Sequence, residues 1–312
     1  ALPAARRLTP WIDYRLLIRA GRPALAGAAL LFVGLFLLGR GPGASDARIS
    51  LFGVQPVEFV KVLMVVFLAA YLHERWQSLR ETRERRGVFA NLPGWLRPPG
   101  LHHIWPGVLA VGACAGALAV VRDLGPAIIL TTLFFLLYAI ARRGIGLPAI
   151  GLAGMAAVAW LFYRFGESQT IRTRVGMWLD PWDTPFRGGN HVAQSLWAFA
   201  SGGFWGTGIG WGNPSWVVAS HTDFVLSAVG EELGWLGVAA VLGLLGLVCW
   251  RAVRIAMRAP SDFGFFLATG IASLFAIQTL VIAGGVLGLL PLTGVVTPFV
   301  SYGKSGMVAN LL

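Results

Sequence analysis

Long apolar stretches recur along this chain and limit what it can fold into. They occupy residues 24–40, 57–73, 104–121, 124–141, 147–164, 224–250 and 264–290, and a last, partial one begins near residue 299. A helix needs about 20 mostly apolar residues to cross a hydrocarbon core of about 30 Å. Only 12% of the 312 residues are charged, whereas soluble domains have about 25%. We therefore predict an all-α polytopic membrane protein, a transmembrane helical bundle of about eight spans forming a single integral membrane domain, 1–312.

The basic residues between these stretches predict the orientation of the chain. If the chain crosses the membrane at each stretch, four basic regions fall on the same side, which is the cytoplasmic side because Lys and Arg favour it. The net charge of +11 is therefore interpreted as an orientation signal and a contact with anionic lipid, not as a nucleic-acid footprint. The four regions contain Arg15, Arg19 and Arg22; Arg75, Arg80, Arg83, Arg85, Arg86 and Arg97; Arg142 and Arg143; and Arg251, Arg254 and Arg258.

One predicted outer connection, residues 165–223, is much longer than the others. Connections longer than about 12–15 residues are usually functional or disordered, and this one is rich in Trp and Gly, unlike a disordered linker. Its piece from Asn190 to Ser201 predicts a short amphipathic or re-entrant helix. The glycine run from Gly206 to Gly212 lacks the spacing of a nucleotide-binding loop. We interpret it as flexible backbone packed over a cavity that faces lipid.

Glu58 and Lys61 stand three residues apart at the start of the second stretch. This spacing places them on one helix face, close enough to pair. They either anchor the helix end as an interfacial ion pair or line a polar cavity.

Two further pairs of charged residues lie in the predicted outer segments. Asp123 is expected to cap the next helix, whose first turn contains Pro126, and Arg122 could bind a lipid phosphate. Arg172 and Arg174 precede a Trp-rich stretch. Arginines beside tryptophans suit a headgroup phosphate, and ordinary interfacial anchoring is the alternative.

A cluster of polar residues marks the start of the sixth stretch. His221 and Thr222 precede Asp223, and Glu231 and Glu232 follow within about two helical turns. Charged groups within a membrane are costly and usually face a cavity or take part in chemistry or transport. A carboxylate at such a rim can act as a base. The alternatives are favourable placement of Asp223 at a helix N-terminus, and pairing of the two glutamates with an Arg.

The last motif breaks an apolar stretch twice with proline, at Pro291 and Pro298. Broken helices in membranes often line a binding site. Lys304 is the only charge that follows. The two cysteines, Cys114 and Cys249, lie within apolar stretches and predict neither a metal site nor a disulfide framework.

Taken together, these motifs resemble the SEDS family (shape, elongation, division and sporulation), the RodA/FtsW group of bacterial cell-wall polymerases. The resemblance runs from about residue 50 to the end of the chain. The matching stretches are Gln55 to Lys61; Asp123 to Gly125; Trp178 to Trp182; Gln194 to Leu196 with Ser201 to Gly203; His221 to Phe224 with Glu231 to Gly234; and Leu289 to Gly294 with Pro298 to Gly303.

The resemblance implies ten membrane helices, of which the eight seen here would be the third to the tenth. The chain is accordingly expected to lack the first two helices of the family. Its two ends are expected to be cut.

The resemblance also implies an activity, a peptidoglycan glycosyltransferase that polymerises lipid II at the outer leaflet with inversion. Asp223 would be the catalytic base. The alternatives are a lipid-linked-sugar transporter (flippase) and an inactive membrane scaffold for a penicillin-binding protein. The candidate substrate-binding residues are Glu58, Lys61, Arg172, Arg174, His221, Thr222, Ser301 and Lys304.

The implied partners are lipid II (the undecaprenyl-pyrophosphate disaccharide peptide), a class B penicillin-binding protein and membrane lipid, with no nucleic acid. The implied location is the bacterial cytoplasmic (inner) membrane, with the active site facing the outer side. No cofactor is specified with certainty. A divalent cation, Mg²⁺ or Mn²⁺, is an alternative to the cationic side chains for offsetting charge on the leaving pyrophosphate.

Four departures from the family pattern define a divergent member. Val121-Arg122 stand where the family usually has Gln-Pro, and Val218-Ala219 stand where it usually has Pro-Glu. Ile282 replaces a usual Asn. The segment from Gly303 to Gly306 contains Lys304 where the family has a Gly-Gly-Ser-Ser sequence.

Overall fold

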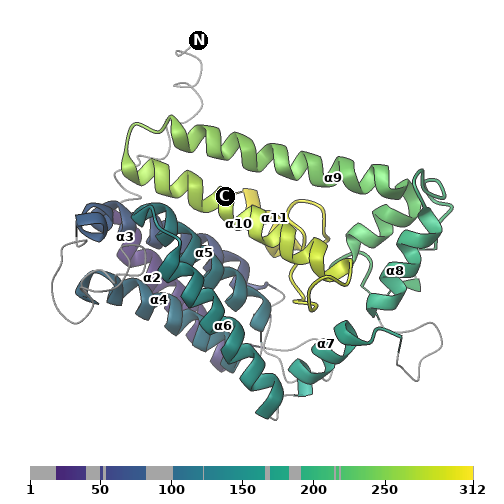
Figure 1. The fold of residues 1–312 in the computed structure, drawn as a ribbon, viewed down its shortest axis with the longest axis horizontal. Coiled ribbons are helices and arrows are strands. Elements are labelled where there is room, and N and C mark those ends of the chain that lie inside the picture. Colours follow the sequence, from purple (N-terminus) through teal and green to yellow (C-terminus); the bar gives the residue numbers. More distant parts are fainter. Residues whose placement is uncertain are drawn as a thin grey trace. The chain divides into compact units, whose positions relative to one another are not determined.

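The structure is a computed structural model, and it describes residues 19–39, 50–51, 54–81, 101–121, 123–165, 169–182, 191–213, 216–217 and 219–311. Within these ranges the chain is helical, and its only β-type pairing is an isolated bridge between Leu51 and Val54. The all-α prediction is confirmed (Figure 1).

All seven predicted full spans are helices. Six helices among the described residues are long and apolar enough to cross a membrane, and the apolar part of α4, Ile104–Val120, is shorter. The seven helices are α2 (Gly21–Leu38), α3 (Pro56–Glu81), α4 (Leu101–Val120), α5 (Leu124–Arg142), α6 (Gly146–Phe165), α9 (Val225–Met257) and α10 (Asp262–Val286), and the C-terminal helix α11 is Lys304–Leu311.

The predicted boundaries near the C-terminus were wrong. The stretch predicted to reach residue 290 ends as α10 at Val286, and the last helix begins at Lys304 instead of near residue 299. Between them lies an irregular segment, residues 287–303, which we call the α10–α11 connection. Pro291 and Pro298 explain it, because proline has no backbone N–H and disfavours helical geometry in the residue before it.

The long outer connection contains two helices. The predicted short amphipathic helix is confirmed as α8 (His191–Gly202), which buries Val192, Ser195 and Phe199 on one face. The other helix, α7 (Gln169–Leu179), was not predicted, and it carries Arg172 and Arg174.

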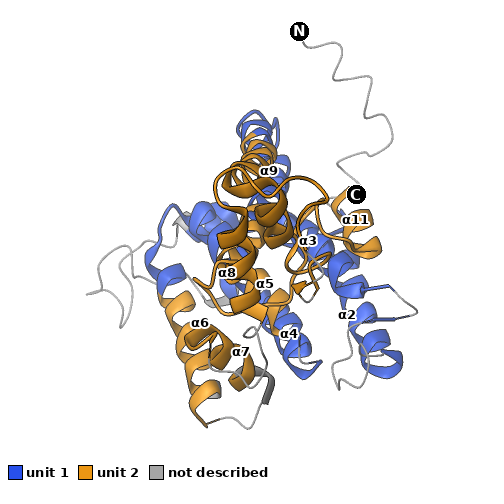
Figure 2. Cartoon of the chain, turned by 90° about the vertical axis from the view of Figure 1, so that its right-hand side faces the viewer, with its two compact units in different colours: residues 1–123, 130–149, 251–273 blue, residues 124–129, 150–250, 274–312 orange. Residues whose placement is uncertain are grey.

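The chain divides into two compact units (Figure 2). Unit 1 comprises residues 1–123, 130–149 and 251–273, and unit 2 comprises residues 124–129, 150–250 and 274–312. In unit 1, Gly21 of α2 packs against Ala70 of α3, and the Cys114 thiol of α4 lies 3.5 Å from the Met64 sulfur of α3. The proposed active-site residue Asp223 belongs to unit 2.

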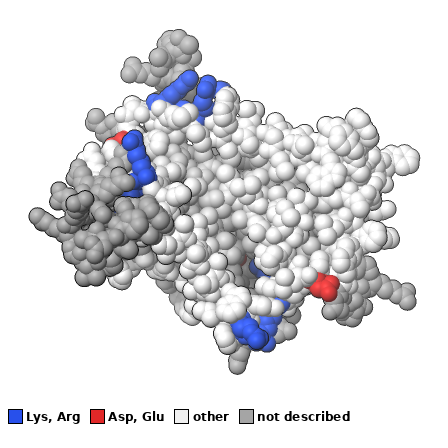
Figure 3. All heavy atoms as spheres, in the orientation of Figure 1, with Lys and Arg blue, Asp and Glu red and all other residues white. Residues whose placement is uncertain are grey.

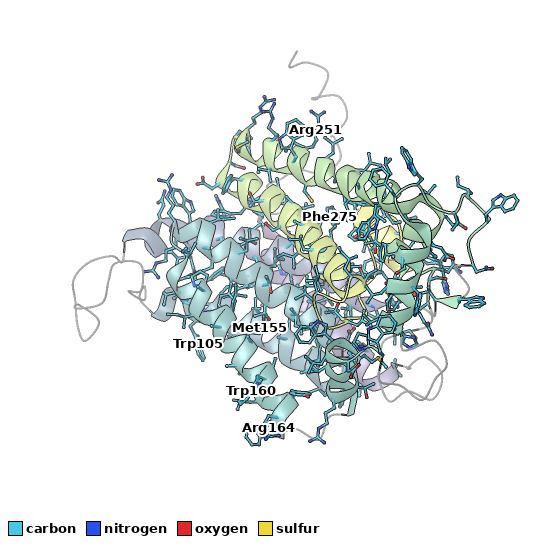
Figure 4. All side chains as sticks on the ribbon, turned by 45° about the vertical axis from the view of Figure 1, so that its right-hand side comes forward. Trp105, Met155, Trp160, Arg164, Arg251 and Phe275 are labelled. Carbon is cyan, nitrogen blue, oxygen red and sulfur yellow. The ribbon has the colours of Figure 1, made fainter. Side chains whose placement is uncertain are left out.

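The described surface is largely uncharged. Figure 3 shows white, uncharged residues over most of the face in view, with Lys and Arg gathered in a few places. Helices α6 and α9 expose large apolar side chains, including Trp160 on α6 and Leu244 on α9. Trp160 and Arg164 lie near one end of α6, and Arg251 lies towards the end of α9 (Figure 4). Such apolar exposure suits helices that face lipid.

Helix α9 is broken at Gly234, and the glycine-rich loop before the helix fills the break. Gly234 has φ 68° and ψ −170°, a conformation that is essentially restricted to glycine. The loop amides of Thr207 and Gly208 donate to the carbonyls of Glu231 and Glu232, at 2.9 and 3.0 Å. These bonds hold the loop against the helix, and the flexibility expected of its backbone stays a prediction.

Replacing Gly234 by alanine is expected to destabilise the protein by about 1–3 kcal/mol, because alanine does not readily adopt this conformation. The melting temperature of the purified protein in detergent measures the effect. The matched control is Gly243→Ala in the same helix, where an added Cβ would meet nothing within 4 Å. That control should be neutral or stabilising by about 0.5–1 kcal/mol. Equal melting temperatures for the two variants would contradict the prediction.

Candidate active site

The sequence from Ala219 to Phe224 forms a tight turn directly before α9. The carbonyl of Ala219 accepts hydrogen bonds from the Thr222 amide at 3.0 Å, the Thr222 hydroxyl at 3.3 Å and the Phe224 amide at 3.2 Å. Ala219 itself has φ 57°, which is uncommon for alanine. The hydrogen bonds that close the turn therefore use a backbone carbonyl and not the side chain of Ala219. Position 219 is one of those at which the sequence departs from the pattern of the family that it resembles.

Asp223 lies in this turn, half-buried and two residues before the first residue of α9. Burial raises the pKa of its carboxyl group above the ordinary value, because removal from water disfavours the charged form. The positive charge of Arg174, and to a smaller extent His221, opposes this shift in the pKa. Asp223 is thus a carboxylate with raised basicity beside two basic side chains.

Arg174 holds the α10–α11 connection. Its Nη1 donates to the carbonyl of Thr293 at 3.1 Å. Its Nη2 would lie 3.3 Å from a Cβ at Gly294, which also has φ 70°. The carbonyl bond accounts for one of the guanidinium donors, and the expected binding of a headgroup phosphate stays a prediction. Arg172, on the same helix, is exposed.

The C-terminal part of the α10–α11 connection holds the turn. The Ser301 hydroxyl donates to the carbonyl of Thr222 at 2.5 Å and accepts from the Thr297 amide at 2.8 Å. The Tyr302 amide donates to the carbonyl of His221 at 2.8 Å. The structure therefore brings together three sequence-predicted residues, His221, Thr222 and Ser301, although about 80 positions separate them along the chain.

Sequence reasoning missed the other residues that hold this connection in place. The Trp178 indole of α7 donates to the Gly288 carbonyl at 2.9 Å. The Ser195 hydroxyl of α8 donates to the Val286 carbonyl at 2.7 Å and lies 2.7 Å from the Ser227 hydroxyl of α9. Trp178 and Ser195 both stand within the motifs that carry the family resemblance, but nothing in the motifs shows which carbonyls they bind.

The expected capping role of Asp123 was wrong. Asp123 occupies the N-cap position of α5, but its side chain makes no capping hydrogen bond. A capping side chain accepts from the second or third residue of the helix, and the third residue here is Pro126, which has no N–H. The next glycine has a clear packing role, because a Cβ at Gly125 would collide with the Thr293 carbonyl. Arg122 and Val218 lie outside the described residues.

Glu231 and Glu232 bind the glycine-rich loop. Oε1 of Glu231 accepts from the Asn213 amide at 2.8 Å, and Oε1 of Glu232 accepts from the Gly210 amide at 3.3 Å. The hydrogen-bond partners of these carboxylates among the described residues are backbone amides, and the expected pairing with an Arg is not observed there. The two glutamates thus support the break in α9 and do not add to the chemistry of Asp223.

Glu58 and Lys61 form the predicted ion pair, with 2.8 Å between Nζ and Oε1. Glu58 is 6% and Lys61 1% exposed, so the pair is buried within unit 1. Glu58 is thus the charge partner of the Lys61 ammonium group. Both interpretations, an ion pair that anchors the helix end and a pair that lines a polar cavity, stay predictions.

The remaining candidates occupy different environments. Lys304 is exposed and is the first residue of α11, whereas Val121 and Ile282 are buried among apolar residues. In the described part of the chain, no three His, Cys, Asp or Glu side chains are close enough together to hold a metal ion.

A family model described as a cell cycle protein, which unites FtsW, RodA and SpoVE, matches residues 12–312 of the chain. The chain belongs to this family. The chain is 37% identical over 305 residues to the peptidoglycan glycosyltransferase RodA of Mycobacterium bovis, a match that covers 96% of this chain and 63% of that protein. It is 31% identical over 307 residues to a probable peptidoglycan glycosyltransferase FtsW of a Geobacter species, covering 96% and 78%.

The fold is also similar to that of a solved structure. One chain of a peptidoglycan synthase complex, described as coordinating polymerization and crosslinking, matches with a TM-score of 0.69 and 26% identity over 96% of this chain and 80% of that one. The SEDS resemblance and the polytopic membrane fold are confirmed. The chain spans about 63% of the length of its mycobacterial relative.

Replacing Asp223 by asparagine is expected to raise the melting temperature at neutral pH. The folded protein holds a carboxyl group whose pKa is raised by burial, so ionised Asp223 costs stability, and asparagine does not ionise. The advantage should be complete above the folded-state pKa and absent below the unfolded-state pKa, where the aspartate is protonated in both states. Melting curves of both proteins over a pH series measure this. A lower melting temperature for the variant at neutral pH would contradict the prediction.

Proposed function

We propose that this chain is the catalytic part of a peptidoglycan glycosyltransferase that polymerises lipid II, with Asp223 as the general base. The observation that carries the proposal is the position of Asp223: a half-buried carboxylate with a raised pKa, in a turn held by Ser301 and near the charge of Arg174. Relatives named as peptidoglycan glycosyltransferases support the reaction class.

The proposed step is an inverting glycosyl transfer. The Asp223 carboxylate takes the proton of the acceptor sugar's 4-hydroxyl, and that oxygen forms a bond to C1 of the donor. The bond between C1 and the pyrophosphate oxygen breaks, and its electron pair leaves with undecaprenyl pyrophosphate. A raised pKa suits this role, because a base works best when its pKa lies nearer the operating pH.

Cationic groups are proposed to offset the charge that grows on the leaving pyrophosphate. Arg172 and Lys304 are exposed and could reach a phosphate directly, whereas Arg174 has one donor engaged with Thr293. Glu58 and Lys61 stay candidate substrate-binding residues, and both are buried within unit 1. The roles of His221 and Thr222 are to shape the turn and the environment of Asp223.

A divalent cation fits this site only as a shared ion. Mg²⁺ is commonly held by one or two carboxylates together with substrate phosphates. Asp223 could supply one carboxylate, and the pyrophosphate would supply the other ligands. Such an ion would neutralise negative charge on the leaving group.

The partner and the location follow from the same proposal. A solved relative belongs to a peptidoglycan synthase complex, which supports a penicillin-binding protein of class B as the partner that cross-links the new strand. The chain is a multi-pass membrane protein, and we place it in the bacterial inner membrane with Asp223 facing the outer side. The positions of the basic regions support this orientation.

Replacing Asp223 by asparagine is expected to lower the rate of lipid II polymerisation by a factor of about 10²–10⁴, the usual contribution of a general base. The full-length protein with its partner, supplied with lipid II, is assayed for glycan strands. Glu231→Gln and Glu232→Gln are the matched controls, since an amide oxygen still accepts the backbone hydrogen bonds, and both should stay active. Full polymerisation by the Asp223 variant would rule out the assigned base. Movement of lipid II across vesicles without chain growth would favour the transporter alternative.

Replacing Arg174 by methionine is expected to move the acidic limb of the pH–rate profile to higher pH. The positive charge of Arg174 lowers the pKa of Asp223, so its loss raises that pKa, and the base is then protonated at a higher pH. The profile of kcat/KM against pH measures the shift. Arg174→Lys keeps the charge and should shift the limb less, and Arg172→Met should leave it in place. An unchanged limb in Arg174→Met would count against Asp223 as the titrating base.

A further inference from the structure

Among the described residues of unit 2, four side chains have a buried polar atom without a hydrogen-bond partner, those of His191, Gln278, Thr279 and Thr297, and of these residues only Gln278 and Thr297 are themselves buried. Gln278 of α10 is 1% exposed, and neither Nε2 nor Oε1 has a partner among the described residues. Thr297 of the α10–α11 connection is 2% exposed, and its hydroxyl likewise has none. A buried donor or acceptor left unpaired costs about 1–3 kcal/mol, so each such group needs an explanation.

The two side chains belong to two segments that pack together. Leu292 of the connection contacts the position of Gly285 near the end of α10, at 3.4 Å. Further along, the ring of Phe299 packs against that of Phe275, with 5.2 Å between centroids (Figure 4 labels Phe275). The connection therefore runs back along α10 for about 15 Å, or ten helical residues. Thr297 is two residues before Phe299 and Gln278 is three residues after Phe275, so both belong to the part of this path that ends at the Phe275–Phe299 contact.

Gln278 also lies on the correct face of the helix. Phe275, Gln278, Ile282 and Gly285 follow the spacing of residues that share one helix face. The first and last of these contact the connection. Gln278 is therefore on the face of α10 that packs against the connection, and the structure has no hydrogen bond between its amide and the Thr297 hydroxyl.

We propose that Gln278 and Thr297 bind a buried water molecule between α10 and the α10–α11 connection. Both groups can donate and accept, and water can do both at once. Neither group is charged, so the site suits a neutral ligand of this kind and not an ion. Buried water characteristically satisfies polar groups that the protein leaves unpaired. Irregular backbone at membrane depth needs such partners, because lipid provides none.

The water would position the proposed catalytic turn, a role that rests on the proposed function. The Thr297 amide donates to the Ser301 hydroxyl, which donates to the Thr222 carbonyl, and Asp223 is the next residue. Fixing Thr297 therefore fixes Ser301 and the backbone beside Asp223. Phe299, between them, has φ 62°, a strained conformation for a bulky residue that the surrounding contacts must maintain. Gln278 is thus a positioning residue that acts through the connection.

A double-mutant cycle tests the site without any enzymatic assay. If water bridges the two groups, Gln278→Met and Thr297→Val each lower the melting temperature, and the double variant is no worse than the more damaging single variant. If the site is dry, each substitution removes an unpaired polar group and raises the melting temperature, which would overturn the proposal. The matched control is Thr269→Val, at another buried position of α10. Additive losses in the cycle would also overturn it.

Two further measurements on the full-length protein separate this proposal from the proposed function. A density map that resolves ordered water should show one within 3.5 Å of both side chains, and a direct bond between Gln278 and Thr297 would refute the site. In the lipid II assay, Gln278→Met should lower kcat about tenfold with KM unchanged, because small displacements of a catalytic group are costly. An unchanged kcat would overturn the positioning role. If the wild-type protein does not polymerise lipid II while the cycle and the map agree, the proposed function fails and the water site stands.

Discussion

The irregular backbone of the α10–α11 connection is the constraint on which the rest of unit 2 depends. Chain without regular structure, packed along a membrane helix, must have its polar groups satisfied by the protein itself. The structure meets this need from several elements at once: Trp178 and Arg174 of α7 bind the carbonyls of Gly288 and Thr293, and Ser301 bonds the turn before α9. The same bonds that satisfy the connection therefore assemble the site around Asp223.

A second irregular region follows the same rule with different groups. Where α9 breaks at Gly234, the freed carbonyls of Glu231 and Glu232 accept from the glycine-rich loop, and their side chains bind two more loop amides. The carboxylates of Glu231 and Glu232 therefore accept hydrogen bonds from backbone amides. Asp223 differs from them because burial raises its pKa and basic side chains face it. One cluster in the sequence thus separates into one candidate base and two supporting residues.

The sequence predicted what depends on local pattern and missed what depends on distant contacts. Apolar length located all seven full spans, and residue spacing predicted the Glu58–Lys61 pair. Helix α7 was missed because it is polar and lies in a loop rich in Trp and Gly. The bond from Arg174 to Thr293 joins positions 119 residues apart, and no local pattern specifies it. Asp123 occupies the N-cap position of α5 without a capping hydrogen bond, and Pro126 removes one of the two amides that such a side chain could bind.

The residues that depart from the family pattern differ in their structural importance. The side chain of Ala219 has little effect on the turn, because the Ala219 carbonyl accepts the hydrogen bonds that close the turn. Ile282 matters more, because it is buried on the face of α10 that also carries Gln278 and that packs against the connection. The family resemblance implies an Asn at this position, and this chain has an apolar side chain instead. Of the four residues that share this face, Phe275, Gln278, Ile282 and Gly285, only Gln278 has a side chain that can form hydrogen bonds, so it is the side chain of α10 that the proposed water would bind.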